Sequence, residues 1–275
     1  MNSTRIIHPP ISTRGLKCGK RPPLPDAHPR MASRLMFADF GRNLPPPPDR
    51  CDWGFGITRD MDGNDTVGDC TVCGAKNTIL TDSSAAGHPN RWTRDTVLSI
   101  YSEITGYNPR APLDDYGRNP TDTGALLLDV LSYWRKTGVN GRTIVAYLSV
   151  DFKDNIQLAQ AVRTFGCVYT GIELPTATET QQVWDIPAWP LSLRRQYRPG
   201  SRGGHCVEVS GYDLPGKRLT GDTWGMRIPQ TLRFKDICWT ECYAIVTDEW
   251  LQKDGKSPSG YDVDGLLEAL PAVHR

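Results

Sequence analysis

Apolar residues recur at helical spacing over much of the stretch between residues 70 and 165. The pattern predicts helices over 70–80, 92–105, 123–137 and 154–165, and the apolar face is clearest in the second and third of these. The first predicted helix begins directly after the turn-forming segment 64–69. Cys70 is therefore expected at the N-terminus of a helix.

After residue 166 the pattern changes to short runs rich in β-branched and aromatic residues. These runs predict strands over 167–174, 206–212, 218–223, 230–234 and 242–246, separated by Gly, Pro and Asp turns. A helical half followed by a β-rich half predicts an α+β fold. We assign 51–275 to one globular domain, with a helical lobe over about 51–165 and an antiparallel β lobe over about 166–250. The long loop from Pro175 to Gly204 is interpreted as a rim or lid.

Residues 1–50 differ from the rest in composition and are called the leader. They hold nine Lys and Arg against three Asp and no Glu, although the whole chain has a net charge of only +1. The proline run 45–48 predicts an extended segment, so we interpret the leader as a basic, Pro-rich strap. No aromatic residues alternate with its basic ones as a nucleic-acid surface requires, which argues against a nucleic-acid partner.

Length and cysteine usage narrow the class of protein further. The 275 residues, 38% of them hydrophobic, suit one large domain or two small lobes sharing a cleft. No run of about 18 apolar residues and no apolar signal segment is present, which predicts a cytoplasmic protein with no membrane partner. Eight cysteines without an export signal favour free thiols, although one or two disulfides are not excluded by sequence.

A candidate reactive centre follows from the cysteines and histidines. A thiolate forms near neutral pH at a helix N-terminus or beside an imidazolium, and Cys70 meets the first condition. Of five histidines, only His205 leads into a predicted buried strand. Asp222 lies one predicted strand later and is the candidate to orient the imidazole, and Trp224 would shield that contact from water.

Three blocks around these residues resemble the papain family of cysteine peptidases. The block from Asn64 to Cys70 resembles the family's Gln-x-x-x-Gly-x-Cys. The block 204–212 is similar to the family's His-Ala-Val-x-x-Val-Gly-Tyr, and the block 222–225 is similar to Asn-Ser-Trp-Gly. Order and spacing along the chain also agree, and the similarity spans roughly residues 53 to 248.

The resemblance implies a papain-like two-lobe fold and a thiol hydrolase that cleaves peptide, isopeptide or amide bonds. Cys70 would attack a carbonyl, His205 would move the proton and Asp222 would orient His205. Asn64 and the backbone N–H of Cys70 would form the oxyanion hole. Substrate-binding positions would be Gly124, Gly204 and Trp224. No cofactor and no metal is implied, and the expected partner is a peptide or protein substrate.

Three positions depart from the family pattern. Asn64 has a shorter amide than the usual Gln, Asp69 places a carboxyl group beside the nucleophile, and Asp222 replaces the common Asn. A charge at Asp69 would raise the pKa of the Cys70 thiol. The segments 19–26, 44–48 and 183–185 are also similar to small papain-like proteins of phages and prophages, which implies a host cytoplasm or virion setting and a virion or host-protein partner.

Other interpretations of the same residues stay open at this point. The Cys-x-x-Cys formed by Cys70 and Cys73 could bind zinc together with Cys238 and Cys242, or act alone as a redox pair. A papain-fold protein without catalysis, serving as a binding or virion-associated protein, is a second class. An amidase or transpeptidase acting on cell-wall or isopeptide bonds is a third.

Overall fold

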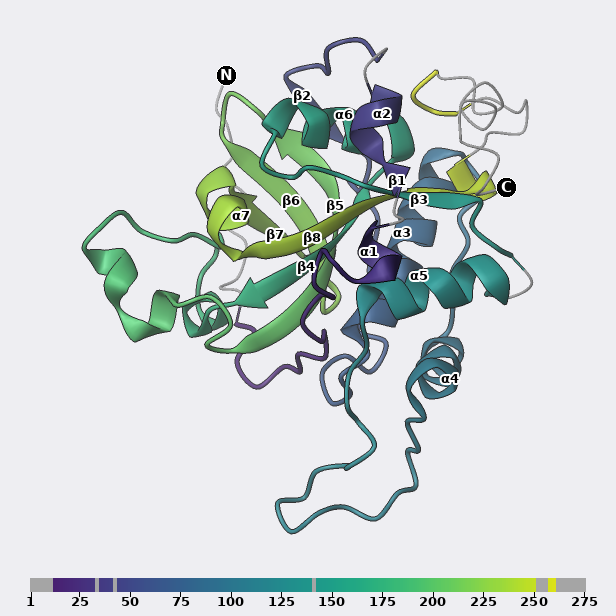
Figure 1. Cartoon of the computed structure of the whole chain (residues 1–275), viewed down its shortest axis with the longest axis vertical. Helices are drawn as coiled ribbons and strands as arrows, with labels where there is room; N and C mark the ends of the chain where they lie inside the picture. Colours follow the sequence, from purple (N-terminus) through teal and green to yellow (C-terminus); the bar gives the residue numbers. More distant parts are fainter. Residues whose placement is uncertain (1–11, 33–34, 42–43, 140–141, 251–256, 261–275) are drawn as a thin grey trace.

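One mixed sheet organises the chain. The computed structural model describes residues 12–32, 35–41, 44–139, 142–250 and 257–260. Its eight-stranded sheet has the order β1-β3-β8-β4-β5-β6-β7, with β2 pairing on β5 (Figure 1). The pairs are antiparallel except for β1 beside β3. The strands are β1 (Leu35–Met36), β2 (Arg50–Asp52), β3 (Ala146–Ser149), β4 (Val168–Leu174), β5 (Gly203–Asp213), β6 (Arg218–Thr223), β7 (Met226–Thr231) and β8 (Trp239–Val246).

Helices pack on both sides of this sheet. The α-helices are α1 (Pro29–Ala32), α2 (Phe37–Gly41), α3 (Cys70–Ala85), α4 (Arg94–Thr105), α5 (Leu127–Lys136), α6 (Asn155–Phe165) and α7 (Leu232–Cys238). Short 3-10 helices are η1 (Thr176–Glu179), η2 (Leu191–Leu193), η3 (Arg195–Tyr197) and η4 (Asp248–Trp250). Within the described ranges, no helix has the length and apolar character needed to span a membrane.

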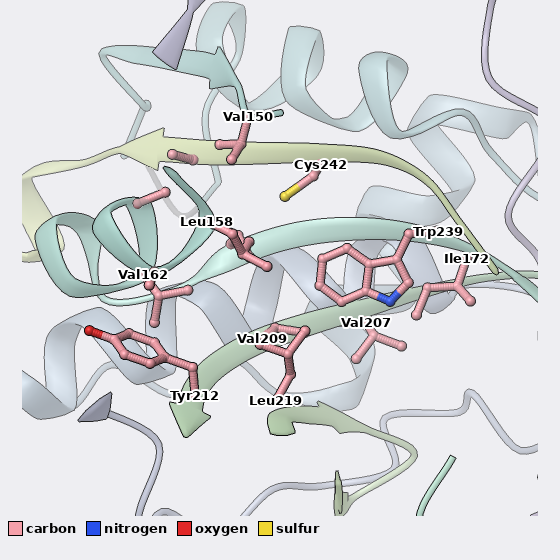
Figure 2. Close-up of a cluster of buried hydrophobic side chains, with 14 of the residues drawn as sticks. Val150, Leu158, Val162, Ile172, Val207, Val209, Tyr212, Leu219, Trp239 and Cys242 are labelled. Atoms are coloured by element: carbon pink, nitrogen blue, oxygen red, sulfur yellow. The ribbon is translucent and has the colours of Figure 1, made fainter. Parts of the chain in front are cut away.

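Two hydrophobic clusters occupy the two faces of the sheet. One cluster holds α3, α4 and α5 against Tyr169 and Tyr243 of the sheet. The other joins α2, α6 and α7 to the opposite face, where Val207 and Val209 of β5 lie (Figure 2). Because side chains alternate along a strand, β5 contributes to both clusters. The candidate active site lies where β5 passes the beginning of α3.

Local sequence explains where the helices begin and end. Thr93 caps α4 by accepting a hydrogen bond from the backbone N–H of Thr96, and Gly106 ends the helix in a left-handed conformation. Asp154 caps α6 by accepting from two backbone N–H groups. By contrast, α3 is buried along nearly its whole length, so its stability comes from packing rather than from a polar outer face.

The predicted elements are found with one clear exception. The segment 230–234 was expected to be a strand, but β7 ends at Thr231 and α7 follows immediately. The Thr231 hydroxyl accepts a hydrogen bond from the backbone N–H of Phe234, which starts the helix. The predicted helical half also contains β3, which pairs with β8. In the predicted rim loop, Trp184 is fully buried and Trp189 is exposed.

Candidate active site

Cys70 is the first residue of α3 and is almost completely buried. Backbone N–H groups of Cys206 and Gly19 point to its sulfur. Since Cys206 directly follows His205, this contact brings the start of β5 against the candidate nucleophile. Burial nevertheless raises the pKa of the Cys70 thiol to about 12, with the two N–H groups offsetting only part of the effect. In this state the thiol is protonated at neutral pH.

Residues 16–21 of the leader, which we call the strap, lie against Cys70, with the backbone N–H of Gly19 directed at its sulfur. The backbone N–H of Lys20 donates to the Gly204 carbonyl at 3.0 Å on the sheet side. On the helical side, the Gly19 carbonyl accepts from Ala125 and the Arg21 N–H donates to Ala125, both at 2.9 Å. The strap is thus an extended peptide with backbone hydrogen bonds on both sides, and it continues to α1 beside α5 (Figure 1).

Glycines allow the strap to lie this close. A Cβ on Gly19 would stand 1.8 Å from the carbonyl oxygen of Gly68. A Cβ on Gly124 would stand 2.1 Å from the Gly19 oxygen, and one on Gly204 would stand 2.2 Å from the Lys20 oxygen. Real side chains do not fit at these distances, so all three positions require glycine while the strap is seated.

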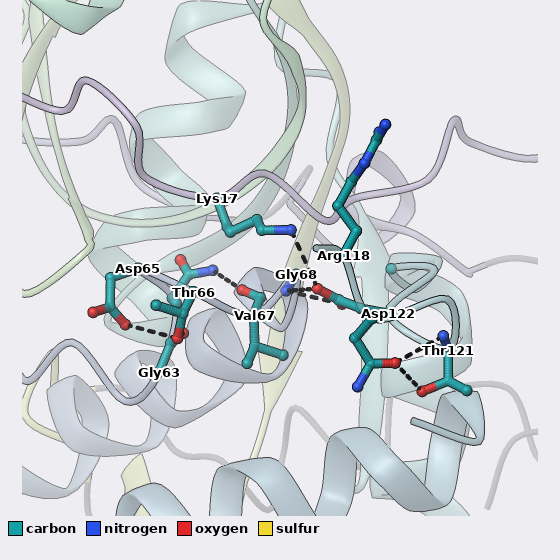
Figure 3. Close-up of polar contacts among 12 residues, drawn as sticks. Lys17, Gly63, Asp65, Thr66, Val67, Gly68, Arg118, Thr121 and Asp122 are labelled. Carbon is teal, nitrogen blue, oxygen red and sulfur yellow. Dashed lines mark hydrogen bonds and ion pairs between the residues drawn. The ribbon is translucent and has the colours of Figure 1, made fainter. Parts of the chain in front are cut away.

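A polar anchor fixes the strap beside the loop that precedes Cys70. The Lys17 ammonium lies 3.6 Å from the Asp122 carboxylate (Figure 3). Both oxygens of Asp122 accept from the backbone N–H of Gly68, at 3.0 and 3.1 Å, and one of them accepts from the Tyr101 hydroxyl at 2.8 Å. A further hydrogen bond runs from the Trp224 indole to the Lys17 carbonyl at 3.0 Å.

The three predicted substrate-binding residues therefore contact a peptide segment, and that segment is the chain's own strap. Gly204 bonds to the strap directly, Trp224 holds its Lys17 carbonyl, and Gly124 makes room for the Gly19 carbonyl. Sequence analysis interpreted the leader as a strap but did not identify which of its residues would cover Cys70. The Gly-Lys step at Gly19 was the available signal, because only glycine fits against the Gly68 carbonyl.

His205 is fully buried near the beginning of β5. Its Nε2 lies 2.6 Å from the Thr223 hydroxyl, and its ring stacks on Trp224 with centroids 4.0 Å apart. Its Nδ1 has no hydrogen-bond partner among the described residues. Burial, together with the Arg202 charge, lowers the pKa of His205 well below its ordinary value, so the imidazole is neutral. When Nε2 donates to Thr223, Nδ1 is left as a free proton acceptor.

Asp222 is held in a different environment from the one its predicted role requires. It pairs with Glu208 across β5 and β6, and its Oδ2 accepts hydrogen bonds from Arg59 and Ser210, both at 3.2 Å. The expected contact between Asp222 and His205 is not found among the described contacts. Thr223, one residue later on β6, meets the imidazole instead. Strand alternation explains this difference, because neighbouring residues point to opposite faces.

The two other departures from the family pattern also have structural consequences. The Asn64 amide donates to the Val67 carbonyl at 3.3 Å within its own loop, so the predicted oxyanion donor is engaged locally. Burial raises the pKa of Asp69 to about 8. Asp69 is therefore mostly uncharged at neutral pH, and the expected negative charge beside Cys70 develops only in more alkaline solution.

The zinc interpretation finds no support in the described part of the chain. No group of three or more His, Cys, Asp or Glu there is arranged to hold a metal ion. Cys70 and Cys73 belong to the cluster around α3, whereas Cys238 and Cys242 belong to the cluster on the other face of the sheet. All eight cysteines are free thiols in the structure.

Comparison with known proteins identifies the fold. No family model and no curated protein matches the sequence. Among solved structures, the cysteine protease xylellain from Xylella fastidiosa is similar with a TM-score of 0.62 and 12% identity, over 85% of this chain and 97% of that one. Procathepsin L 3 from the larval midgut of Tenebrio molitor has a TM-score of 0.52 and 13% identity, over 78% and 73% of the two chains. The chain therefore has the papain-like, two-lobe α+β fold.

Proposed function

We propose that this protein is a papain-like cysteine peptidase held in a latent state by its own strap. The supporting observation is the strap itself, an extended polypeptide that is hydrogen-bonded on one side to Gly204 and on the other to Ala125, above Cys70. Extended backbone bound over a cysteine at a helix N-terminus supports a role for that cysteine in attack on a peptide carbonyl.

In the proposed reaction, Nδ1 of His205 takes the proton of the Cys70 thiol, and the sulfur attacks a substrate carbonyl. Backbone N–H groups in the first turn of α3 stabilise the oxyanion, with Asn64 contributing only after its amide leaves the Val67 carbonyl. The proton returns to the leaving amine, and water then resolves the acyl-enzyme. Thr223 takes the place that sequence analysis gave to Asp222, by bonding to Nε2 of His205.

The latent state follows from burial. With the strap seated, the low dielectric around Cys70 and His205 disfavours both the thiolate and the imidazolium, which is why their pKa values move apart. Removal of the strap would let water reach both groups and would bring the thiol pKa down. The nucleophile would then form the reactive ion pair.

The test is labelling of Cys70 with an electrophilic thiol reagent at pH 7, read by mass spectrometry of the labelled peptide. Gly19→Val introduces a side chain that clashes with the Gly68 carbonyl, so it should displace the strap and raise Cys70 labelling about tenfold or more. Ser12→Val, at an exposed leader position outside the strap, is the matched control and should label like the wild type. Addition of His205→Ala to Gly19→Val should slow the reaction.

Peptide-library cleavage by the Gly19→Val chain completes the test. Cleavage should appear with this variant and disappear when Cys70→Ala is added. If Cys70 in the Gly19→Val chain reacts no faster than the other cysteines, the catalytic proposal is wrong.

A papain-fold binding protein without turnover is the second candidate. It is favoured by one observation, the engagement of the Asn64 amide with Val67 in place of an oxyanion site. Fast Cys70 labelling without cleavage of any peptide would support this candidate over the peptidase. The amidase alternative, and the virion or host setting, stay predictions from resemblance.

A further inference from the structure

The side chain of Lys20 is enclosed beside the candidate active site. It is fully buried, and its ammonium lies 3.4 Å from Glu173 and 3.6 Å from Glu241. Lysine is rarely buried at this depth unless its charge is paired. Here one carboxylate, Glu241, is almost completely buried, and the other, Glu173, is partly exposed at the edge.

Lys20 fits beside the sheet because two neighbouring residues, Gly171 and Gly204, are glycines without side chains. A Cβ on Gly171 would stand 2.4 Å from Cε of Lys20, and a Cβ on Gly204 would stand 2.2 Å from the Lys20 carbonyl oxygen. We call the space lined by Gly171, Glu173, Gly204 and Glu241 the Lys20 site. The lysine side chain passes Gly171 and places its charge against the carboxylates, while Gly204 makes room for the Lys20 backbone.

The carboxylate of Glu241 is positioned to pair with a cation. The Tyr243 hydroxyl donates to its Oε2 at 3.1 Å, which fixes the carboxyl group in place. Its Oε1 has no hydrogen-bond partner among the described residues and lies 3.6 Å from the Lys20 ammonium. If the strap leaves, a buried carboxylate remains without its counter-ion, and an entering cation would compensate for its burial.

Besides a cation for Glu241, the site requires a glycine at the position that precedes the lysine. Gly19 immediately precedes Lys20 and lies against the Gly68 carbonyl, where a Cβ would come within 1.8 Å. An occupant that follows the path of the strap therefore needs glycine before its lysine. Neither requirement concerns the chemistry of Cys70, so both can be tested without turnover.

We infer that the Lys20 site is a lysine-selective binding site, and that polypeptides taken up in place of the strap present a Gly-Lys step there. The inference rests on the proposed function in one respect, since it takes those polypeptides to be substrates. The strap then occupies the site as a built-in copy of the preferred sequence. Selectivity comes mainly from Glu241, because an uncharged side chain of the same length would leave this carboxylate buried without a counter-ion.

The experiment measures binding of labelled peptides to the full-length chain that carries Gly19→Val and Cys70→Ala. The first change displaces the strap, and the second prevents cleavage. The reference probe has the sequence of residues 16–22 with Cys18→Ser. Two further probes carry norleucine in place of Lys20 or alanine in place of Gly19. Each of these should bind about tenfold more weakly than the reference probe, measured by fluorescence anisotropy.

A double-mutant cycle assigns the effect to the Lys20 site. With Glu241→Gln added to the protein, the preference for the lysine probe over the norleucine probe should fall to about threefold or less, with Glu173 supplying what remains. Glu179→Gln is the matched control, because Glu179 lies near the leader but pairs with Arg14 and Arg202 instead of Lys20, and the probe omits Arg14. Circular dichroism and thermal unfolding establish that each variant is folded.

The outcomes separate this inference from the proposed function. Equal binding of the lysine and norleucine probes, or an unchanged preference in the Glu241→Gln chain, would overturn the lysine site even if the Gly19→Val chain cleaves other peptides. A lysine preference that depends on Glu241 would support the site even if no cleavage is detected.

If Glu241→Gln unfolds the protein, a charge exchange between residues 20 and 241 of the full-length chain tests the inference instead. Lys20→Glu should release the strap and raise Cys70 labelling, and added Glu241→Lys should reverse this; labelling that stays high would count against the inference.

Discussion

The two faces of the β5–β6 pair differ in chemistry although they share the same backbone. The face toward α3 carries a fully buried polar cluster made of Arg59, Thr81, Glu208, Ser210 and Asp222. The opposite face carries His205 on Thr223 and Trp224, with Val207 continuing into an apolar core. One step along β6 therefore separates Asp222, which belongs to the polar cluster, from Thr223, which contacts His205.

The polar face has the features of a stabilising network. Arg59 donates to Asp222 and to Thr81, and it lies 3.8 Å from Glu208. Burial, reinforced by the Asp222 charge, raises the pKa of Glu208 to about 8. At neutral pH Glu208 is therefore mostly protonated, while Arg59 donates to the neighbouring Asp222. A protonated Glu208 can donate to Asp222, which gives both carboxyl groups a partner.

The largest effect is expected from Asp222→Ala. This change leaves Arg59 buried without its hydrogen-bonded counter-ion, which should lower the free energy of unfolding by about 3–5 kcal/mol. Urea denaturation measures the loss. In a Gly19→Val background, the pH dependence of Cys70 labelling should stay unchanged, because Asp222 faces away from His205. A shifted labelling profile without loss of stability would restore Asp222 as the orienting residue.

A smaller effect is expected from Glu208→Gln. Because the folded-state pKa of Glu208 lies above its ordinary value, the folded chain binds the proton more tightly, and stability falls as pH rises from about 4.5 to about 8. Glutamine imitates the protonated form, so between pH 5 and pH 9 the variant should lose roughly 2–3 kcal/mol less than the wild type. Unfolding free energies across this range measure it. Parallel curves for the two proteins would mean that Glu208 is already ionised near pH 5.

The smallest effect is expected from Thr223→Val, studied in the Gly19→Val background. The change removes the hydrogen bond to Nε2 of His205 and should cost about 1 kcal/mol, or roughly fivefold in the rate of Cys70 labelling. The apparent pKa of the labelling profile should also shift, which a purely structural role would not cause. Thr223→Ser keeps the hydroxyl and should restore both rate and profile. If serine and valine behave alike, Thr223 does not position the histidine.

The sequence was sufficient to predict helices and strands whose formation depends mainly on residues that are neighbours in the chain. The helix that begins at Cys70 and the strands around His205 were predicted because helical and strand periods are properties of short segments. Thr231 shows the limit of this reasoning. Its side chain caps α7 just where the apolar pattern suggested that a strand would continue, so a single cap decided the element.

The sequence by itself determined the α+β class, the candidate pair Cys70 and His205, and the glycines beside them. The tertiary structure alone decided that Thr223 meets His205, that the strap covers Cys70, and that Lys20 lies between two glutamates. The physical reason is that the partner of a side chain on a strand depends on register, and the register of β5 against β6 shifts between Val209 and Gly211. Burial is equally non-local, because it is the packing of distant segments that leaves Asp69 uncharged beside the nucleophile at neutral pH.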